Sequence, residues 1–137
     1  MAKLVPELYC SDIERSLKFY TEVLGFTICY ERRQERFAYL DREDAQIMLE
    51  QPTGRAWLAA EMSFPYGRGM SLQIETSDVD AVYFAVEAAA ERIFLPLEEK
   101  WYLCDDAEHC SRQFIVQDPD GYLLRFFQDI GSRPRIR

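Results

Sequence analysis

"SDIERSLKFYTEVLGF", residues 11–26, contains a complete amphipathic helix with signals at both of its ends. Ser11 is followed three residues later by Glu14, a capping-box pattern that predicts a helix beginning with Ser11 as its N-cap. Apolar residues then recur at the spacing of one helical face: Ile13, Leu17, Tyr20 and Leu24. Gly25 predicts the end of the helix, because glycine adopts the left-handed conformation common after a last turn.

Strand-like segments flank this helix on both sides. Residues 3–10 (KLVPELYC) precede it, and three further segments follow it: 26–33 (FTICYERR), 36–41 (RFAYLD) and 45–51 (AQIMLEQ). The turn residues Arg42, Glu43 and Asp44 join the last two segments. The first part of the chain therefore reads as a βαβββ module.

The same pattern recurs downstream. A strand at 70–76 (MSLQIET) precedes a second helix start with Ser77 and Asp80, and the last strand follows the turn in DPDGYLLRFFQ, residues 118–128. The Asp12 to Asp78 alignment gives an offset of 66 residues and the Asp41 to Asp118 alignment one of 77, so the second module is 11 residues longer. The excess falls in or near EEKWYLCDDAEHCSRQ, residues 98–113.

The repeat predicts an α+β fold of two tandem βαβββ modules, forming a pseudo-symmetric curved mixed sheet with helices on its outer face. The expected organisation is one domain: module 1 at 1–51, a linker at 52–69, module 2 at 70–129 and a tail at 130–137. The linker is rich in Gly and Pro and carries Trp57, Phe64 and Tyr66. Long loops of this kind often border binding sites, but these rings also fit the edge of a core.

Charge and composition exclude several classes of function. The net charge of −8 disfavours a nucleic-acid partner, which needs a basic face, and suits a cationic ligand. No apolar run approaches the roughly 18 residues of a membrane span, and the N-terminus lacks a secretion signal, so we expect a cytoplasmic protein without a membrane partner. Aromatic residues are 14% of the chain, more than a minimal core needs, which predicts rings at a surface or cleft.

The four cysteines are expected to stay reduced in such a chain. Cys10 and Cys29 lie in apolar strand-like runs and are predicted to be small core residues. Cys104, His109 and Cys110 lie close together in sequence but lack a fourth ligand at a recognisable spacing, so no metal site is predicted there.

Alternation along the strands predicts two different faces. The helix side should carry aliphatic and aromatic residues: Leu4, Leu8, Ile47, Leu49, Leu72, Ile74, Leu124 and Phe126. The other side should carry a mixed polar, acidic and aromatic set: Val5, Glu7, Tyr9, Gln46, Met48, Glu50, Ser71, Gln73, Glu75, Leu123, Arg125 and Phe127. Such a mixture suits a concave ligand cleft better than a core.

The doubled module, with SDIERSLKFYTEVLGF near its start and DPDGYLLRFF near its end, resembles the vicinal oxygen chelate superfamily over essentially the whole chain. That group includes glyoxalase I, extradiol dioxygenases, fosfomycin resistance transferases and bleomycin resistance proteins. The resemblance implies metal ligands, usually His, Gln or Glu, on the first and fourth strands of each module. The matching positions here are Val5, Met48, Ser71 (or Met70 if the register slips) and Arg125. These side chains do not suit a divalent ion, so neither a metal nor another cofactor is expected.

Without that metal, the chain resembles the bleomycin resistance branch, whose members bind the drug without chemistry, as dimers. The resemblance implies a homodimer that sequesters a bleomycin-type or other planar cationic antibiotic in an aromatic, acidic cleft at the dimer interface. Expected ligand-binding residues are Phe37, Met48, Glu50, Trp57, Tyr66, Gln73, Trp101, Arg112, Gln113 and Arg125. We expect Arg125 to pair with acidic residues of the cleft.

Two other functions remain open at this point. One is a metal-dependent lyase or dioxygenase of the same superfamily with an atypical site that uses Glu7, Glu50 or Glu75. The other is a binder of an unrelated small metabolite, because a fold does not imply a function. The sequence also leaves open whether the cleft forms within one chain or across a swapped dimer.

Overall fold

The computed structural model describes residues 1–135, which form two compact units. Unit 1 comprises Met1–Gly69 together with Asp118–Tyr122, and unit 2 comprises Met70–Gln117 and the chain from Leu123 onward. The segment expected as a linker, residues 52–69, belongs to unit 1. Each unit contains one βαβββ module, so the predicted α+β class and the internal repeat are confirmed.

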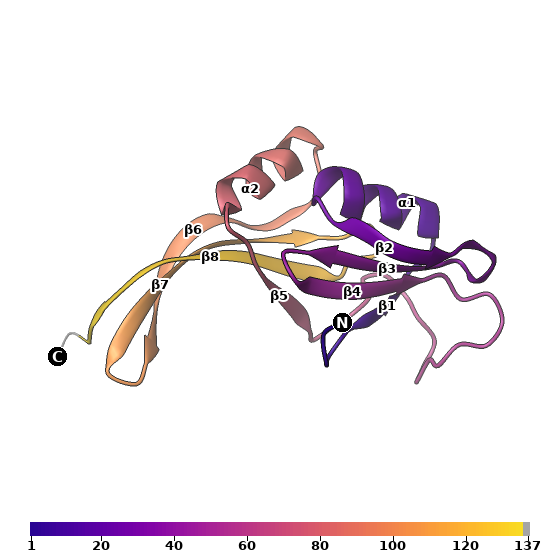
Figure 1. Cartoon of the computed structure of the whole chain (residues 1–137), viewed down its shortest axis with the longest axis horizontal. Helices are drawn as coiled ribbons and strands as arrows, with labels where there is room; N and C mark the ends of the chain where they lie inside the picture. The colour runs from indigo at the N-terminus through magenta and orange to yellow at the C-terminus, as the bar shows by residue number, and fades with distance from the viewer. Residues whose placement is uncertain (136–137) are drawn as a thin grey trace. The chain divides into compact units, whose positions relative to one another are not determined.

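Unit 1 is a four-stranded sheet covered on one face by a helix (Figure 1). Its elements are β1 (Glu7–Tyr9), α1 (Ile13–Lys18), the π-helical turn η1 (Phe19–Val23), β2 (Thr27–Arg32), the 3-10 turn η2 (Arg33–Glu35), β3 (Phe37–Arg42) and β4 (Ala45–Glu50). The strand order is β1-β4-β3-β2, with β1 parallel to β4 and the other pairs antiparallel.

The core of unit 1 lies between its sheet and helix. Leu8, Ile47 and Leu49 are buried on the helix side of their strands, as alternation predicted. Tyr20 and Leu24 pack there from the helical segment, which ends as expected at Gly25, where φ is +82°. The first strand is shorter than predicted, and Leu4, placed in the core by the sequence, is 86% exposed.

The helix starts differ from the predicted caps. Asp12, rather than Ser11, is the N-cap of α1, and its side chain accepts a hydrogen bond from the backbone N–H of Arg15. Asp78, rather than Ser77, likewise caps the second helix through the N–H of Ala81. Both Ser-Asp pairs allow either register, and a carboxylate also suits the positive end of the helix dipole.

Unit 2 repeats the arrangement with a longer hairpin. Its elements are β5 (Ser71–Glu75), α2 (Val79–Ala88), β6 (Ile93–Cys104), β7 (Ala107–Gln117) and β8 (Leu123–Pro134). The order β5-β8-β7-β6 matches that of unit 1, and the sheets are two rather than one continuous sheet. The extended β6 and β7 strands contain the 11-residue excess, and residues 130–134, expected in the tail, continue β8.

The core of unit 2 follows the predicted alternation. Leu124 and Phe126 of β8 are fully buried, and Ile74 of β5 is nearly so. The ring of Phe126 stacks on that of Phe114, with centroids 5.7 Å apart. Arg125, between the two buried residues of β8, lies on the opposite face of the sheet.

The turn that precedes β8 belongs to unit 1. Asp118 is buried, and its carboxylate accepts hydrogen bonds from the backbone N–H groups of Asp120 and Tyr122 and from the hydroxyl of Tyr20. Burial is the main cause that raises the pKa of Asp118 to about 6. The motif is therefore a structural part of unit 1.

The four cysteines are all free thiols. Cys10 is buried as predicted, and burial raises the pKa of its thiol to about 12. Cys29 was predicted to be a core residue and is exposed on β2, so that prediction is wrong. The apolar run around Cys29 misled the prediction, since β2 is an edge strand of its sheet.

Candidate functional site

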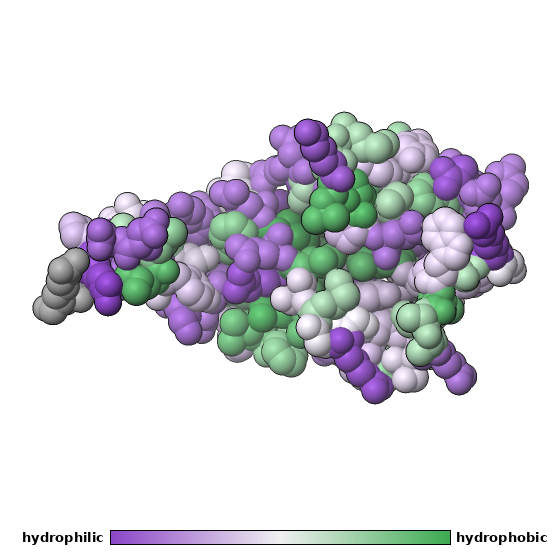
Figure 2. Space-filling model, turned by 90° about the horizontal axis from the view of Figure 1, so that it is seen from below, coloured by the Kyte–Doolittle hydropathy of each residue, from purple (hydrophilic) through white to green (hydrophobic). Residues whose placement is uncertain are grey.

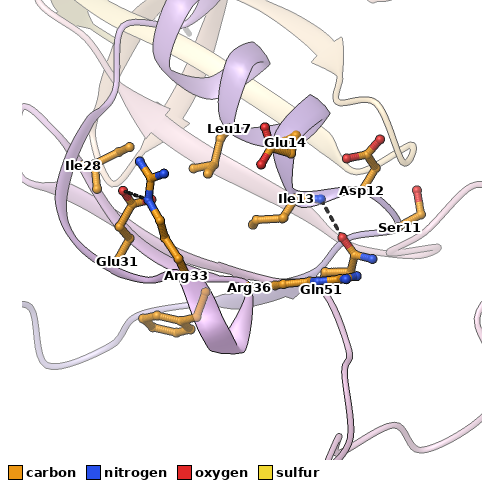
Figure 3. Close-up of a pocket in the computed structure, with 11 residues that line it drawn as sticks. Ser11, Asp12, Ile13, Glu14, Leu17, Ile28, Glu31, Arg33, Arg36 and Gln51 are labelled. Atoms are coloured by element: carbon orange, nitrogen blue, oxygen red, sulfur yellow. Dashed lines mark hydrogen bonds and ion pairs between the residues drawn. The ribbon is translucent and has the colours of Figure 1, made fainter.

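Three pockets of unit 1 have volumes of about 650, 540 and 300 Å³, and the first lies beside the start of α1 (Figure 3). We call it the helix-side pocket, and its volume is about 650 Å³. Its lining residues are Ser11, Asp12, Ile13, Glu14, Leu17, Ile28, Glu31, Arg33, Arg36, Phe37 and Gln51.

Several polar groups of the helix-side pocket already have structural partners. Gln51 accepts a hydrogen bond from the backbone N–H of Ile13 at 3.0 Å, and Asp12 caps α1 (Figure 3). Arg33 is paired with Glu31 at 3.1 Å. The Gln51 contact ties the start of the helix to the end of β4, and Asp12 and Arg33 are engaged by partners of their own, so we do not take this pocket as the ligand site.

The second pocket lies on the sheet face that points away from α1, and we call it the sheet-side pocket. It has a volume of about 540 Å³, within the range of small-molecule sites. Its lining residues are Glu7, Tyr9, Tyr30, Arg32, Glu35, Phe37, Met48, Glu50, Thr53, Arg55 and Trp57. Figure 2, a view from below, shows hydrophilic and hydrophobic residues interleaved on the surface of the chain.

Aromatic rings form one part of the sheet-side pocket. Tyr30 stacks on Tyr39 with centroids 5.2 Å apart and planes at 14°, and it also contacts Phe37. Tyr30 is 43% exposed and Trp57 is 72% exposed, so a ligand can reach both rings, although the guanidinium of Arg55 lies over the ring of Trp57, 5.2 Å from its centroid. The backbone N–H of Trp57 donates to the hydroxyl of Tyr9 at 2.9 Å, which ties the loop to β1.

Three carboxylates line the sheet-side pocket: Glu35 is ion-paired with Arg32 at 2.6 Å, and Glu7 and Glu50 form an acidic pair. The parallel pairing of β1 with β4 sets Glu7 opposite Met48 and Tyr9 opposite Glu50, so Glu7 and Glu50 are near neighbours on one face. The pKa of Glu50 is raised, first by burial and then by the hydrogen bond and negative charge of Glu7. The charge of Arg32 lowers the pKa of Glu50 and offsets part of this repulsion, and a cationic ligand beside the pair would offset more of it.

Unit 2 has a separate, smaller pocket of about 230 Å³ on its own sheet, which we call the glutamine pocket. It is lined by Gln73, Tyr102, His109, Cys110, Ser111, Gln113, Arg125, Phe127 and Asp129. Arg125 donates through Nη2 to the Oε1 of Gln73, its opposite neighbour on β5. The expected acidic partner is not found: no carboxylate within residues 1–135 forms an ion pair with Arg125.

The structure divides the predicted site residues into three groups. The sheet-side pocket contains Phe37, Met48, Glu50 and Trp57. The glutamine pocket contains Gln73, Gln113 and Arg125. Outside both pockets lie Tyr66, Trp101 and Arg112.

Each residue of the third group has a local partner. Tyr66 packs edge-on against Tyr122 at 5.9 Å between centroids, and the guanidinium of Arg133 lies 3.8 Å from the ring centroid of Trp101. Arg112 is ion-paired with Asp80 of α2 at 2.8 Å. Arg112 therefore points to the helix face, because neighbouring side chains of a strand alternate and Gln113 takes the other face.

Sequence reasoning missed several lining residues. Tyr30 and Arg32 share a face with Phe37 through the pairing of β2 with β3, a register that alternation alone did not reveal. Thr53 and Arg55 come from the loop after β4, where no periodic pattern exists. Tyr102 and His109 face each other across the β6–β7 hairpin, whose pairing was not predicted in detail.

Neither a metal-binding cluster nor a membrane-spanning helix is found in the described part of the chain. Among residues 1–135, no group of three or more His, Cys, Asp or Glu side chains is arranged to hold a metal ion. None of the helices in that range has the length and apolar character needed to span a membrane.

Comparisons with known proteins find relatives that match nearly the whole chain. Two curated relatives, from Geobacillus stearothermophilus and Staphylococcus aureus, are named bleomycin resistance protein. Each is 29% identical over 143 aligned positions, covering 96% of this chain and 100% of the relative.

Solved structures show the same fold. TioX from Micromonospora sp. ML1 superposes with a TM-score of 0.70 at 23% identity, covering 95% of this chain and 100% of that one. A protein of unknown function from Agrobacterium tumefaciens str. C58 gives the same TM-score at 27% identity, covering 93% and 94%. Residues 4–126 match the family model for the glyoxalase/bleomycin resistance protein/dioxygenase superfamily, and the chain belongs to that superfamily.

Proposed function

We propose that this chain binds and sequesters a bleomycin-type or other planar cationic antibiotic in the sheet-side pocket, without chemistry. The observation that carries the proposal is the Glu7 and Glu50 pair beside open aromatic faces. A cation is attracted to the two carboxylates, and planar rings stack on Tyr30 and Trp57, each stacked pair contributing about 0.5 to 1.5 kcal/mol beyond area burial. The relatives named bleomycin resistance protein support this choice of ligand.

The available donor atoms favour binding over metal-assisted catalysis. The four positions that match the superfamily's metal ligands carry an alkyl group, a thioether, a hydroxyl and a guanidinium: Val5, Met48, Ser71 and Arg125. Divalent ions of these enzymes prefer imidazole and carboxylate, and a guanidinium has no lone pair to donate. The residues present do not fit the metal, so the proposal contains no metal-dependent step.

We also propose that the chain is a homodimer and that the sheet-side pocket lies at the dimer interface. In unit 1, the exposed apolar side chains that a second copy would cover include Trp57 and Leu58, and aromatic residues are enriched at such interfaces. Sedimentation analysis should give twice the chain mass, with or without bleomycin. A monomer in both conditions would remove the interface from the proposal and leave the binding intact.

Calorimetric titration with bleomycin tests the binding itself. Wild-type protein should bind one drug per chain, and the double variant Glu7→Gln/Glu50→Gln should bind at least about tenfold more weakly because both attractive charges are gone. The matched control is Glu22→Gln/Glu61→Gln, which removes the same charge from unit 1 outside its pockets and should keep wild-type affinity. The proposal would be refuted if wild-type protein gave no binding heat, or if the control double variant lost as much affinity for bleomycin as the Glu7→Gln/Glu50→Gln variant.

A separate experiment tests whether the protein leaves bleomycin chemically unchanged. Bleomycin incubated with the protein and released by acid should be recovered with unchanged mass. A mass change that requires the protein would instead indicate an enzyme.

A further inference from the structure

The glutamine pocket of unit 2 contains two buried polar atoms without partners. Gln113 is only 3% exposed, and its Oε1 has no hydrogen-bond partner among the described residues. The Nε of Arg125 is also buried, and it also lacks a hydrogen-bond partner among the described residues. Leaving such groups unsatisfied costs about 1 to 3 kcal/mol each, so a pair of them lining one cavity points to a ligand.

The orientation of the Gln113 amide is set by its neighbours. Its Nε2 donates to Glu98 Oε2 at 2.8 Å and to the hydroxyl of Tyr102 at 2.7 Å. The reversed orientation would place Oε1 against the carboxylate of Glu98, two acceptors in contact. Gln113 therefore presents an acceptor to the pocket and keeps its donors on the wall.

Arg125 presents the complementary donor. Gln113 is opposite Phe127 on β8, so Arg125 is its diagonal neighbour, at about 7 to 8 Å between backbones, within reach of long side chains. The Nη2 of Arg125 donates a hydrogen bond to the Oε1 of Gln73, and this bond fixes the position of the guanidinium. A group between the two side chains must accept from Arg125 and donate to Gln113.

Charge discriminates among the groups that satisfy this geometry. A carboxylate would suit Arg125 but would face the oxygen of Gln113, with the carboxylates of Glu98 and Asp129 nearby. An ammonium would suit Gln113 but would face the Arg125 cation. A carboxamide has a carbonyl oxygen and an N–H side by side and carries no charge, and its substituent can pack on Phe127 or Tyr102.

We propose that the glutamine pocket binds an uncharged carboxamide group, with its oxygen on Arg125 and its N–H on Gln113 Oε1. This inference is separate from the antibiotic site proposed above, because it rests only on residues of unit 2. The ligand class is a small molecule with a carboxamide on an aromatic or apolar substituent, of a size compatible with about 230 Å³.

Three probes of nearly equal size test the chemistry on the wild-type protein: benzamide, acetophenone and benzoate. Titrations followed by the backbone amide signals of Gln113, Arg125 and Phe127 should show the tightest binding for benzamide. Acetophenone keeps the carbonyl and lacks the N–H, so it should bind about fivefold more weakly, the loss expected for one neutral hydrogen bond. Benzoate equal to or tighter than benzamide, or no local shifts with benzamide, would overturn the proposal.

Variants then test the residues. Arg125→Met should weaken benzamide binding at least about tenfold, as expected for a hydrogen bond from a charged donor. Arg135→Met removes a positive charge from the same unit outside the pocket and should leave the affinity unchanged. Equal affinity in the wild-type and Arg125→Met proteins would overturn the assignment. The probe series decides the ligand class even if Arg125→Met does not fold, and bleomycin titration reports on the sheet-side pocket independently.

Discussion

The Asp120 carboxylate accepts hydrogen bonds from both the backbone N–H and the hydroxyl of Ser11, 109 positions earlier in the chain. Arg15 adds an ion pair to the same carboxylate at 3.2 Å. On the other side of the turn, the hydroxyl of Tyr122 donates to the backbone carbonyl of Tyr9 at 2.8 Å. The turn before the last strand thus ties β1, the strand that carries Glu7, to the start of α1.

Gly121 in this turn should not tolerate a side chain. Its φ is +102°, and an added Cβ would lie 2.6 Å from the Cβ of Pro65. Gly121→Ala should lower the free energy of unfolding by about 3 kcal/mol, from backbone strain and steric overlap together. Urea denaturation measures the loss.

Gly69→Ala is the matched control for the turn glycine. Gly69 has a similar φ of +87°, and within residues 1–135 no atom beyond its own chain neighbours lies within 4 Å of an added Cβ. The variant therefore incurs only the backbone strain, about 1 kcal/mol. Equal losses in the two variants would show that the contact with Pro65 is unimportant.

Asp118 should make stability depend on pH. Its folded-state pKa of about 6 lies above the ordinary value of 3.8, so the folded state binds the proton more tightly than the unfolded state. Its contribution to stability is therefore complete below about pH 4 and is lost as the pH rises to about 6.

Asp118→Asn isolates this contribution. The amide oxygen can still accept from the N–H groups of Asp120 and Tyr122, but the side chain no longer ionises. Urea denaturation between pH 4 and pH 7 should show a smaller decline in stability in the variant than in the wild type. Identical slopes would contradict the raised pKa.

Ligand binding at the sheet-side pocket should depend on the ionisation of Glu50. Its raised pKa means that the side chain holds a proton above the ordinary value of 4.5, and a cation binds better to the ionised form. The affinity for bleomycin should increase as the pH rises through the raised pKa of Glu50, and it should level off at higher pH, where Glu50 is fully ionised. Glu50→Gln should remove that part of the pH dependence in calorimetric titrations; an unchanged profile would exclude Glu50 from the site.

Tryptophan fluorescence can locate the ligand, because the chain has only two tryptophans, Trp57 and Trp101. Trp57 lines the sheet-side pocket, whereas Trp101 lies outside it on β6. Bleomycin should change the emission of Trp101→Phe protein, in which Trp57 is the sole emitter, and affect Trp57→Phe protein much less. The reverse pattern would place the drug in unit 2.

Several features of the fold could be predicted because they depend on local order along the chain. Two local patterns reflect which side chains must leave water: the helical spacing from Ile13 to Leu24 and the strand alternation at Ile47 and Leu49. The structure confirms both patterns. Where two adjacent residues offered equivalent caps, as at Ser11 and Asp12, the local pattern could not choose between them.

The amino-acid order by itself determined the doubled module, the buried helix-facing residues and the acidic, aromatic character of the other strand face. Only the tertiary structure decided which of those residues meet. Strand register sets Glu7 beside Glu50 and leaves Arg125 with Gln73 instead of a carboxylate, and it turns Arg112 toward Asp80. Register and loop path come from contacts between residues far apart in the chain, which no local period encodes.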